Sequence, residues 1–144
     1  FEQIKLLTVT VDRLKTWARP GLVCIGDAAH AMSPIGGVGI NLAIQDAVAA
    51  GNLLFKPLQT RAPDDRELAS VQTRREFPTR VTQRMQIFAQ DNVISRVLAS
   101  SHIQAPWLLN LVDRWPFLQR IPARLVGMGF RPEHIRTPDV HASR

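Results

Sequence analysis

The chain has 144 residues, of which 45% are hydrophobic and 21% charged, a composition that is ordinary for a globular protein and excludes wholesale disorder. Its net charge of +6 comes mainly from arginines dispersed among acidic and apolar residues, which indicates a solvated helical face rather than a nucleic-acid surface. The most apolar stretch, 38–55, is interrupted by Asn41, Gln45, Asp46 and Asn52 and therefore predicts no membrane span.

Short apolar segments open the chain. Residues 4–11, IKLLTVTV, predict a strand, and RPG at 19–21 predicts a tight turn, because proline fixes φ and glycine accepts a positive φ. Residues 22–25, LVCI, predict a short strand that is buried on both faces of a parallel sheet. Cys24, the single cysteine, is accordingly expected to be buried and reduced, which fits a cytoplasmic location. Residues 26–37, with glycines at both ends, predict a loop.

The next segment, 38–55, predicts a helix. Its apolar residues occur nearly all round the helical circumference, so we expect a helix that is buried on most sides. Among its polar residues, Asn41 and Gln45 are four residues apart and share one face, whereas Asp46 and Asn52 are expected to lie elsewhere.

A second long helix is predicted after a polar connector. The connector KPLQTRAPDD, residues 56–65, ends in Asp64 and Asp65, either of which can cap the following helix. That helix is expected from Arg66 to about Ser100, kinked or divided by Pro78. Its predicted apolar face consists of Val81, Met85 and Phe88, extended by Ile94, Val97 and Leu98.

The last third of the chain predicts two short helices and a tail. The helices are expected over 106–113 and 116–126, each beginning at a proline, with Gly127 and Gly129 closing the second. Residues 130–144 are expected to be extended over a surface or frayed.

The join between the predicted strand and the first helix, GDAAHAMSPIGGVGINLAIQDA at 26–47, carries the main chemical signal. A helix N-terminus has unpaired N–H groups and a partial positive charge, and Gly36, Gly37 and Gly39 remove side chains that would keep a ligand away. Asp27 is placed to accept hydrogen bonds from hydroxyls. The pattern indicates a nucleotide-like cofactor, although the glycines would equally allow close packing of the helix on the sheet.

The residue order of this stretch resembles the second FAD-binding motif of the flavoprotein aromatic hydroxylases, the monooxygenases built like p-hydroxybenzoate hydroxylase. The positions that match are Gly26, Asp27, Ala28, Ala29, His30, Pro34, Gly37, Gly39, Asn41, Asp46 and Ala47. The resemblance implies a mostly helical α/β fragment of an FAD/NAD(P)-binding Rossmann-like fold. It also implies the C-terminal portion of such an enzyme, because the family's G-x-G-x-x-G and Asp-Gly motifs do not occur here.

Within that resemblance, residues 1–55 correspond to the end of a substrate-domain crossover and the C-terminal part of the FAD-binding domain, and 56–144 to a helical region and tail. Asp27 would bind the ribityl hydroxyls of FAD, and the backbone from Gly37 to Ile40 would face the pyrimidine edge of the ring. The full set of implied cofactor-binding residues is Gly26, Asp27, Pro34, Gly37, Val38, Gly39, Ile40 and Asn41, and the implied substrate contacts are Pro34 and Ile35. No side chain is assigned a catalytic role.

The implied reaction is reduction of FAD by NAD(P)H, capture of O2 as a flavin C4a-hydroperoxide, and oxygen transfer to an organic, often aromatic, substrate. It needs no metal, and His102, His134 and His141 show no ligand spacing, so we interpret them as surface or packing residues. His30 is expected to pack rather than to transfer protons.

Several alternatives stay open from the sequence. The enzyme could be another flavoenzyme of the same fold, a reductase or halogenase, or the chain could be a non-catalytic flavin- or partner-binding module. Residues 106–122 could form a membrane-surface element or a homodimer contact, although internal packing is favoured. The arginines of 74–84 could bind the 2′-phosphate of NADPH, although a solvated face is favoured. We expect the chain alone to bind FAD poorly and not to turn over.

Overall fold

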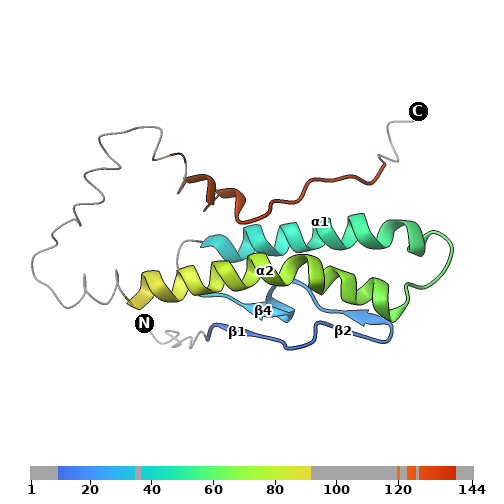
Figure 1. The fold of residues 1–144 in the computed structure, drawn as a ribbon, viewed down its shortest axis with the longest axis horizontal. Helices are drawn as coiled ribbons and strands as arrows, with labels where there is room; N and C mark the ends of the chain where they lie inside the picture. The colour runs from blue at the N-terminus through green and yellow to red at the C-terminus, as the bar shows by residue number, and fades with distance from the viewer. Residues whose placement is uncertain (1–9, 35–36, 92–119, 121–122, 126, 139–144) are drawn as a thin grey trace, which may run out of the picture.

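The structure, a computed structural model, describes residues 10–34, 37–91, 120, 123–125 and 127–138. Two long helices, α1 (Val38–Leu58) and α2 (Asp65–Ala89), lie side by side, with short strands on one side and the C-terminal segment on the other (Figure 1). The strands are β1 (Asp12–Arg13), β2 (Ala18–Arg19), β3 (Leu22–Val23) and β4 (His30–Ala31). The described residues are thus mostly helical, with a few short strands.

The strands form two antiparallel pairs, β1 with β4 and β2 with β3. The predicted turn at 19–21 is confirmed, with Gly21 at a φ of +74°, and it folds the chain back so that Val23 pairs with Ala18. The prediction of a doubly buried parallel strand at 22–25 is therefore wrong, because this hairpin leaves Leu22 56% exposed. The predicted strand at 4–11 falls largely outside the described residues.

Two smaller expectations for this region also change. Cys24 is half-buried rather than buried, since it lies just beyond the hairpin, where its N–H donates to the carbonyl of Trp17. The predicted loop at 26–37 contains a short 3₁₀ turn, η1 (Gly26–Ala28), as well as β4. Of these two elements, η1 packs against α1 and so brings the start of the glycine-rich join against the helix.

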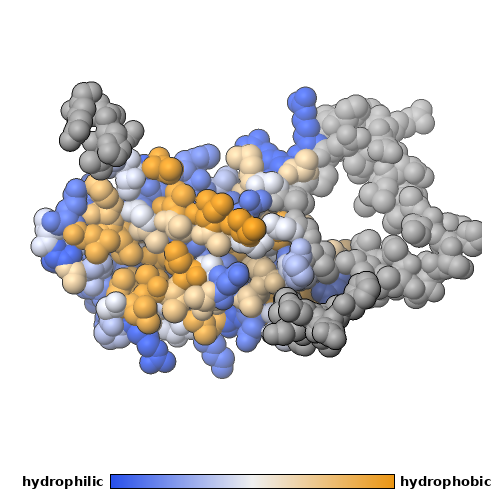
Figure 2. Space-filling model, turned by 180° about the vertical axis from the view of Figure 1, so that it is seen from behind, coloured by the Kyte–Doolittle hydropathy of each residue, from blue (hydrophilic) through white to orange (hydrophobic). Residues whose placement is uncertain are grey.

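Helix α1 begins at Val38 as predicted and ends three residues beyond the predicted boundary. It is not buried all round, because its packing on α2 and η1 leaves Ile40 73% and Ile44 57% exposed. Hydrophobic residues gather accordingly on the face seen in Figure 2. By length and composition alone α1 could cross a membrane, a test that core helices also pass, so the absence of a membrane span stays a prediction.

Helix α2 begins with the predicted cap. The Asp64 side chain accepts from the N–H of Glu67, and the Glu67 side chain accepts from the N–H of Asp64, which forms a capping box. Pro78 lies within one continuous helix, so it does not divide α2, and the alternative of a kink at Pro78 stays a prediction. Val81, Met85 and Phe88 share one side of α2 as predicted, but this side is not buried, since Met85 is 44% and Phe88 67% exposed. The predicted extension through Ile94, Val97 and Leu98 falls outside the described residues.

The buried side of the second half of α2 is polar instead. Gln83 donates to the carbonyls of Asp12 and Ala31 at 2.8 and 3.1 Å, and Gln86 donates to the carbonyl of Ser33 at 2.9 Å. These bonds tie α2 to the backbone of β1, of β4 and of the segment that follows β4. Amide side chains therefore take the place that hydrophobic residues were expected to occupy.

The end of the described chain, residues 127–138, starts in a helical turn and continues as an extended segment along α1; we call it the C-terminal strap (Figure 1). The helical turn ends at Gly129, whose φ is +70°, so the predicted stop is confirmed there. The predicted extended tail is confirmed for 130–138, while most of the helices expected between 106 and 126 fall outside the described residues.

Three polar side chains of α1 hold the strap. Asn41 donates to the carbonyl of Gly127 at 3.5 Å, Gln45 donates to that of Met128 at 2.7 Å, and Asn52 donates to that of His134 at 2.8 Å. The expectation that Asn52 lies on a different face is wrong, because eleven residues make about three full helical turns. Asn41, Gln45 and Asn52 thus form one polar stripe.

Candidate cofactor site

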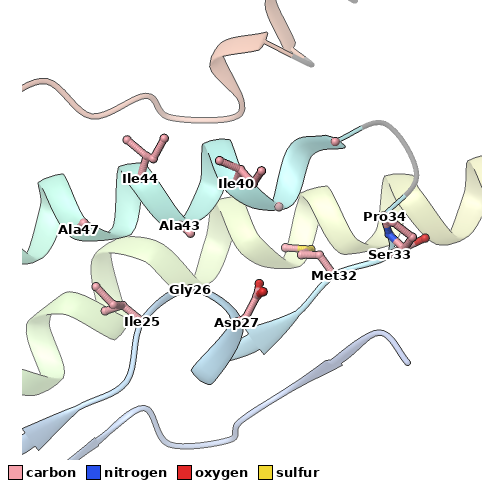
Figure 3. A pocket seen from close by; sticks show the side chains of 12 residues that line it. Ile25, Gly26, Asp27, Met32, Ser33, Pro34, Ile40, Ala43, Ile44 and Ala47 are labelled. Atoms are coloured by element: carbon pink, nitrogen blue, oxygen red, sulfur yellow. The ribbon is translucent and has the colours of Figure 1, made fainter. Parts of the chain in front are cut away.

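A cavity of about 800 Å³ lies where the η1 turn, the segment after β4 and the first half of α1 meet (Figure 3). Its lining is predominantly apolar and comes from Ile25, Gly26, Asp27, Met32, Ser33, Pro34, Gly37, Gly39, Ile40, Ala43, Ile44 and Ala47. Its volume is within the range of small-molecule and cofactor sites. The apolar side of α1 that is exposed in this structure forms one of its walls.

The cavity brings together six of the eight predicted cofactor-binding residues: Gly26, Asp27, Pro34, Gly37, Gly39 and Ile40. Val38 does not line it, and the Asn41 side chain instead donates to the strap at Gly127. Ile35, the predicted substrate contact beside Pro34, falls outside the described residues. The binding roles themselves stay predictions.

Of the helical wall of the cavity, sequence reasoning named Ile40 and missed Ala43, Ile44 and Ala47. Ile40, Ala43, Ile44 and Ala47 recur at intervals of three and four residues, so they share one side of α1. This spacing was visible, but an apolar stripe of this kind is equally typical of a buried core.

The two long helices differ at their N-termini. At α2, the Asp64 capping box satisfies backbone N–H groups of the first turn. At α1, the capping position is Gly37, which has no side chain to accept a hydrogen bond, and the first turn carries no acidic residue. The N–H groups and the positive end of the helix dipole of α1 are therefore available to an electron-rich ligand.

The glycines of the join serve two different purposes. A Cβ at Gly26 would lie 3.0 Å from the Cβ of Ala43, and one at Gly39 would lie 3.3 Å from the Cβ of Met32, so these two glycines allow close packing. A Cβ at Gly37 would meet no atom within 4 Å, but the φ of Gly37 is +63°, so its backbone conformation and not its packing requires glycine there. Close packing, one of the two interpretations left open by the sequence, thus applies at Gly26 and Gly39, whereas the ligand interpretation stays a prediction.

Asp27 supplies the acidic group of the cavity. Its side chain points from the η1 turn toward α1 and is exposed (Figure 3). Within the described part of the chain its carboxylate accepts no hydrogen bond, so both oxygens are available to donors on a ligand. The combination of a free carboxylate, an uncapped helix N-terminus and apolar walls fits a ligand with hydroxyls, a flat apolar body and an electron-rich edge.

Directly behind the cavity lies a buried charged cluster centred on Asp46, which is completely buried. One carboxylate oxygen accepts from Arg75 Nε at 2.8 Å, and the other accepts from the N–H of Gly26 at 3.1 Å and pairs with His30 Nε2 at 2.5 Å. Burial alone raises the pKa of the Asp46 carboxyl, but the hydrogen bonds from His30, Arg75 and Gly26 outweigh it and hold this pKa below its ordinary value.

This cluster corrects one expectation and supports another. Arg75 is not on a solvated face, since it is fully buried against Asp46 and so cannot bind the 2′-phosphate of NADPH. His30 packs, as predicted, with its ring centroid 5.1 Å from that of Trp17. The described residues contain no group of three or more potential metal ligands.

The comparisons with known proteins agree on one family. A model of the FAD binding domain family matches residues 1–85, the N-terminal part of this chain and more than half of it. The chain is 39% identical over 125 residues to the 6-methylpretetramide 4-monooxygenase of Streptomyces rimosus, covering 87% of this chain and 30% of the relative.

Fungal relatives match over a similar region. The FAD-dependent monooxygenase atmM of Aspergillus flavus is 35% identical over 117 residues, covering 78% of this chain and 23% of the relative. The FAD-dependent monooxygenase cle3 of Aspergillus versicolor is 33% identical over 135 residues, covering 88% of this chain and 26% of the relative. The chain therefore spans less than a third of the length of these relatives.

Proposed function

This chain belongs to the FAD binding domain family, and from that premise we propose that it supplies one wall of the FAD site of a monooxygenase. The proposed reaction hydroxylates a small organic, aromatic substrate with O2 and NAD(P)H. The names of the relatives support the reaction class. Because the chain spans less than a third of those relatives, the proposal assigns to it a share of the cofactor site rather than the whole reaction. We further propose a cytoplasmic enzyme, supported by a single cysteine without a partner in the sequence.

The observation that carries the proposal is the convergence of Asp27 and the uncapped N-terminus of α1 on one cavity. Asp27 would accept hydrogen bonds from the ribityl hydroxyls, and the N–H groups that follow Gly37 would face the electron-rich pyrimidine edge. Pro34, on the rim of the cavity, would lie between the ring and the substrate. The apolar side of α1 would exclude water from the ring.

When bound, FAD supplies the redox chemistry, taking electrons from NAD(P)H and passing them to O2. The residues of this chain bind and orient it. The positive end of α1 would stabilise negative charge on the adjacent edge of the ring, and among the described residues that line the cavity only Asp27 is ionisable. The contribution of these residues is therefore binding and electrostatic.

Flavin titration of the apoprotein expressed from its complete gene tests the proposal. Riboflavin, FAD and ADP are compared by fluorescence and calorimetry in wild type, in Asp27→Ala, and in Asp64→Ala as a control at the other helix N-terminus. Loss of a hydrogen bond to a charged group predicts that Asp27→Ala weakens riboflavin and FAD about tenfold or more, by the same factor. ADP affinity should not change, because ADP lacks the ribityl chain.

The riboflavin titration decides whether the cavity is a flavin site. No riboflavin binding by the wild type, or equal riboflavin affinity in Asp27→Ala and wild type, would contradict the proposed site. The reaction class is tested separately by NAD(P)H oxidation with O2 uptake over a panel of aromatic compounds. Oxidation of NAD(P)H that never yields an oxygenated product would favour a reductase.

A further inference from the structure

We propose that Asp46 is a positioning residue of the cavity: by holding the backbone N–H of Gly26 it fixes the η1 turn, and with it Asp27, at the correct place against α1. This inference rests on the proposed flavin site. Asp46 lies behind the cavity wall and does not line it, so it acts through the turn rather than on the ligand.

A single backbone N–H attaches the η1 turn to α1 in the part of the chain that the structure describes. The turn is closed internally by the N–H of Ala29, which donates to the carbonyl of Gly26 at 2.9 Å. Among the described residues, the 3.1 Å bond from the Gly26 N–H to Asp46 is the sole hydrogen bond that joins the turn to the helix. Gly26 also packs tightly against Ala43, with no room between them for a side chain at position 26. The position of the next residue, Asp27, therefore depends on this bond.

Asp46 is itself held from the opposite side. Arg75 donates through Nε to the other carboxylate oxygen, and its remaining nitrogens donate to the carbonyl of Arg131 and the side chain of Gln45, both at 3.3 Å. Glu133 Oε1 lies 3.7 Å from Arg75 NH1. The carboxylate is thus fixed between the turn and an arginine that the C-terminal strap also contacts.

The groups around position 46 require a carboxylate there, because of its charge and the number of hydrogen bonds it can accept. Asp46 receives three donors, from Gly26, His30 and Arg75, and all of them need an acceptor. Asparagine offers one acceptor oxygen, and its NH₂ group would face a donor. A buried ion pair is by itself weak evidence for a stabilising role, because apolar replacements are often as stable. At Asp46, however, one carboxylate oxygen binds the η1 turn at Gly26 and the other binds Arg75 of α2, and this arrangement points to a role in placing the turn.

The test compares Asp46→Asn with Asn52→Ala in the protein expressed from its complete gene. Asn52 is the matched control, since it also lies on α1 and bonds the strap at His134 and Arg136 but does not touch the η1 turn. Hydrogen–deuterium exchange of the Gly26 amide and riboflavin affinity are measured well below each unfolding temperature. In Asp46→Asn we expect Gly26 exchange and the riboflavin dissociation constant each to rise about tenfold or more, with ADP affinity unchanged.

A second variant covers the case in which Asp46→Asn does not fold. The double replacement Asp46→Leu with Arg75→Met removes both charges together, which cores often tolerate, and still deletes the bond to Gly26. A folded double variant with wild-type riboflavin affinity, or an Asn52→Ala variant that loses as much riboflavin affinity as Asp46→Asn, would overturn the inference.

The exchange measurement separates the two proposals. If the wild type binds no riboflavin but Gly26 exchange accelerates in Asp46→Asn and not in Asn52→Ala, the flavin site fails while the control of the turn by Asp46 stands. If riboflavin binds and Gly26 exchange is the same in both variants, the inference fails while the flavin site stands.

Discussion

Replacing Arg75 by methionine tests the energetics of the buried cluster. The substitution keeps most of the side-chain volume but removes the arginine that pairs with the Asp46 carboxylate, which is completely buried. Breaking a buried ion pair by removing one partner costs about 3–5 kcal/mol, whereas replacing both partners by apolar residues is often neutral. We therefore expect Arg75→Met to lower the free energy of unfolding by about 3–5 kcal/mol and the double variant with Asp46→Leu to recover most of that loss.

The pH dependence gives a second signature of the same cluster. Asp46 has a pKa below its ordinary value of 3.8, so its contribution to stability is complete above that pH and is lost as the pH falls through the lower folded-state pKa. Without Arg75, fewer hydrogen bonds counteract the effect of burial on the pKa of Asp46, so this pKa is higher in the variant. Protonation of Asp46 then removes the destabilising buried charge at a higher pH. The stability difference between wild type and Arg75→Met should be largest near about pH 7 and shrink as the solution is acidified.

Urea unfolding followed by circular dichroism at several pH values measures both effects. A loss below about 1 kcal/mol for Arg75→Met would refute the reasoning, because exposed ion pairs contribute no more than that. A stability difference that grows on acidification would contradict the assigned sign. A double variant less stable than Arg75→Met alone would show that the partner groups around the pair, and not the buried charge, dominate.

Three further predictions concern single positions. Gly37→Ala should lower the free energy of unfolding by about 1–2 kcal/mol, because φ at Gly37 is +63°. Gly51→Ala should raise it by about 0.5–1 kcal/mol, because Gly51 lies in mid-α1 with open space around it. Equal thermal shifts in the two variants would be inconsistent with this difference. Asp64→Ala should cost about 1 kcal/mol through loss of the capping box, with unchanged riboflavin affinity, measured by urea unfolding and titration. Gln83→Leu should cost about 1–3 kcal/mol, since it leaves two backbone carbonyls without their donor, and a thermal midpoint equal to wild type would contradict that role.

The features that the sequence predicted correctly are those with local causes. The turn at 19–21, the start of α1 and the Asp64 cap each depend on residues within a few positions of one another. A cavity lies at the join for which the sequence predicted a cofactor site, because glycine, acid and helix N-terminus adjoin in the chain, while its occupant stays a prediction. Local chemistry of this kind is readable without knowing the tertiary fold.

The features that the sequence did not predict depend on partners far away in the chain. The buried side of α2 is polar because Gln83 reaches backbone carbonyls of β1 and β4, more than fifty residues earlier. Arg75 is buried because Asp46 opposes it, 29 residues away. Hydrophobic periodicity assigns such residues to the solvent, since it carries no information about a specific polar partner. Asn52 is a different case, because its separation of eleven residues from Asn41 makes about three helical turns, and the sequence alone could therefore have placed both on one face.

The buried pair also explains how a helix that contains an aspartate can still present a positive end to the cavity. Asp46 lies eight residues into α1, about 12 Å along its axis from Val38, close enough for an unpaired carboxylate to oppose the helix dipole. Arg75, at 2.8 Å, neutralises that charge within the protein interior. What remains at the cavity is the unopposed N-terminus of α1, the arrangement that favours negative charge on the pyrimidine edge of a flavin when it is reduced. The Arg75→Met variant should then make flavin reduction less favourable, so a potentiometric titration that finds an unchanged midpoint would show that the cluster acts on the position of the η1 turn and not on the field in the cavity.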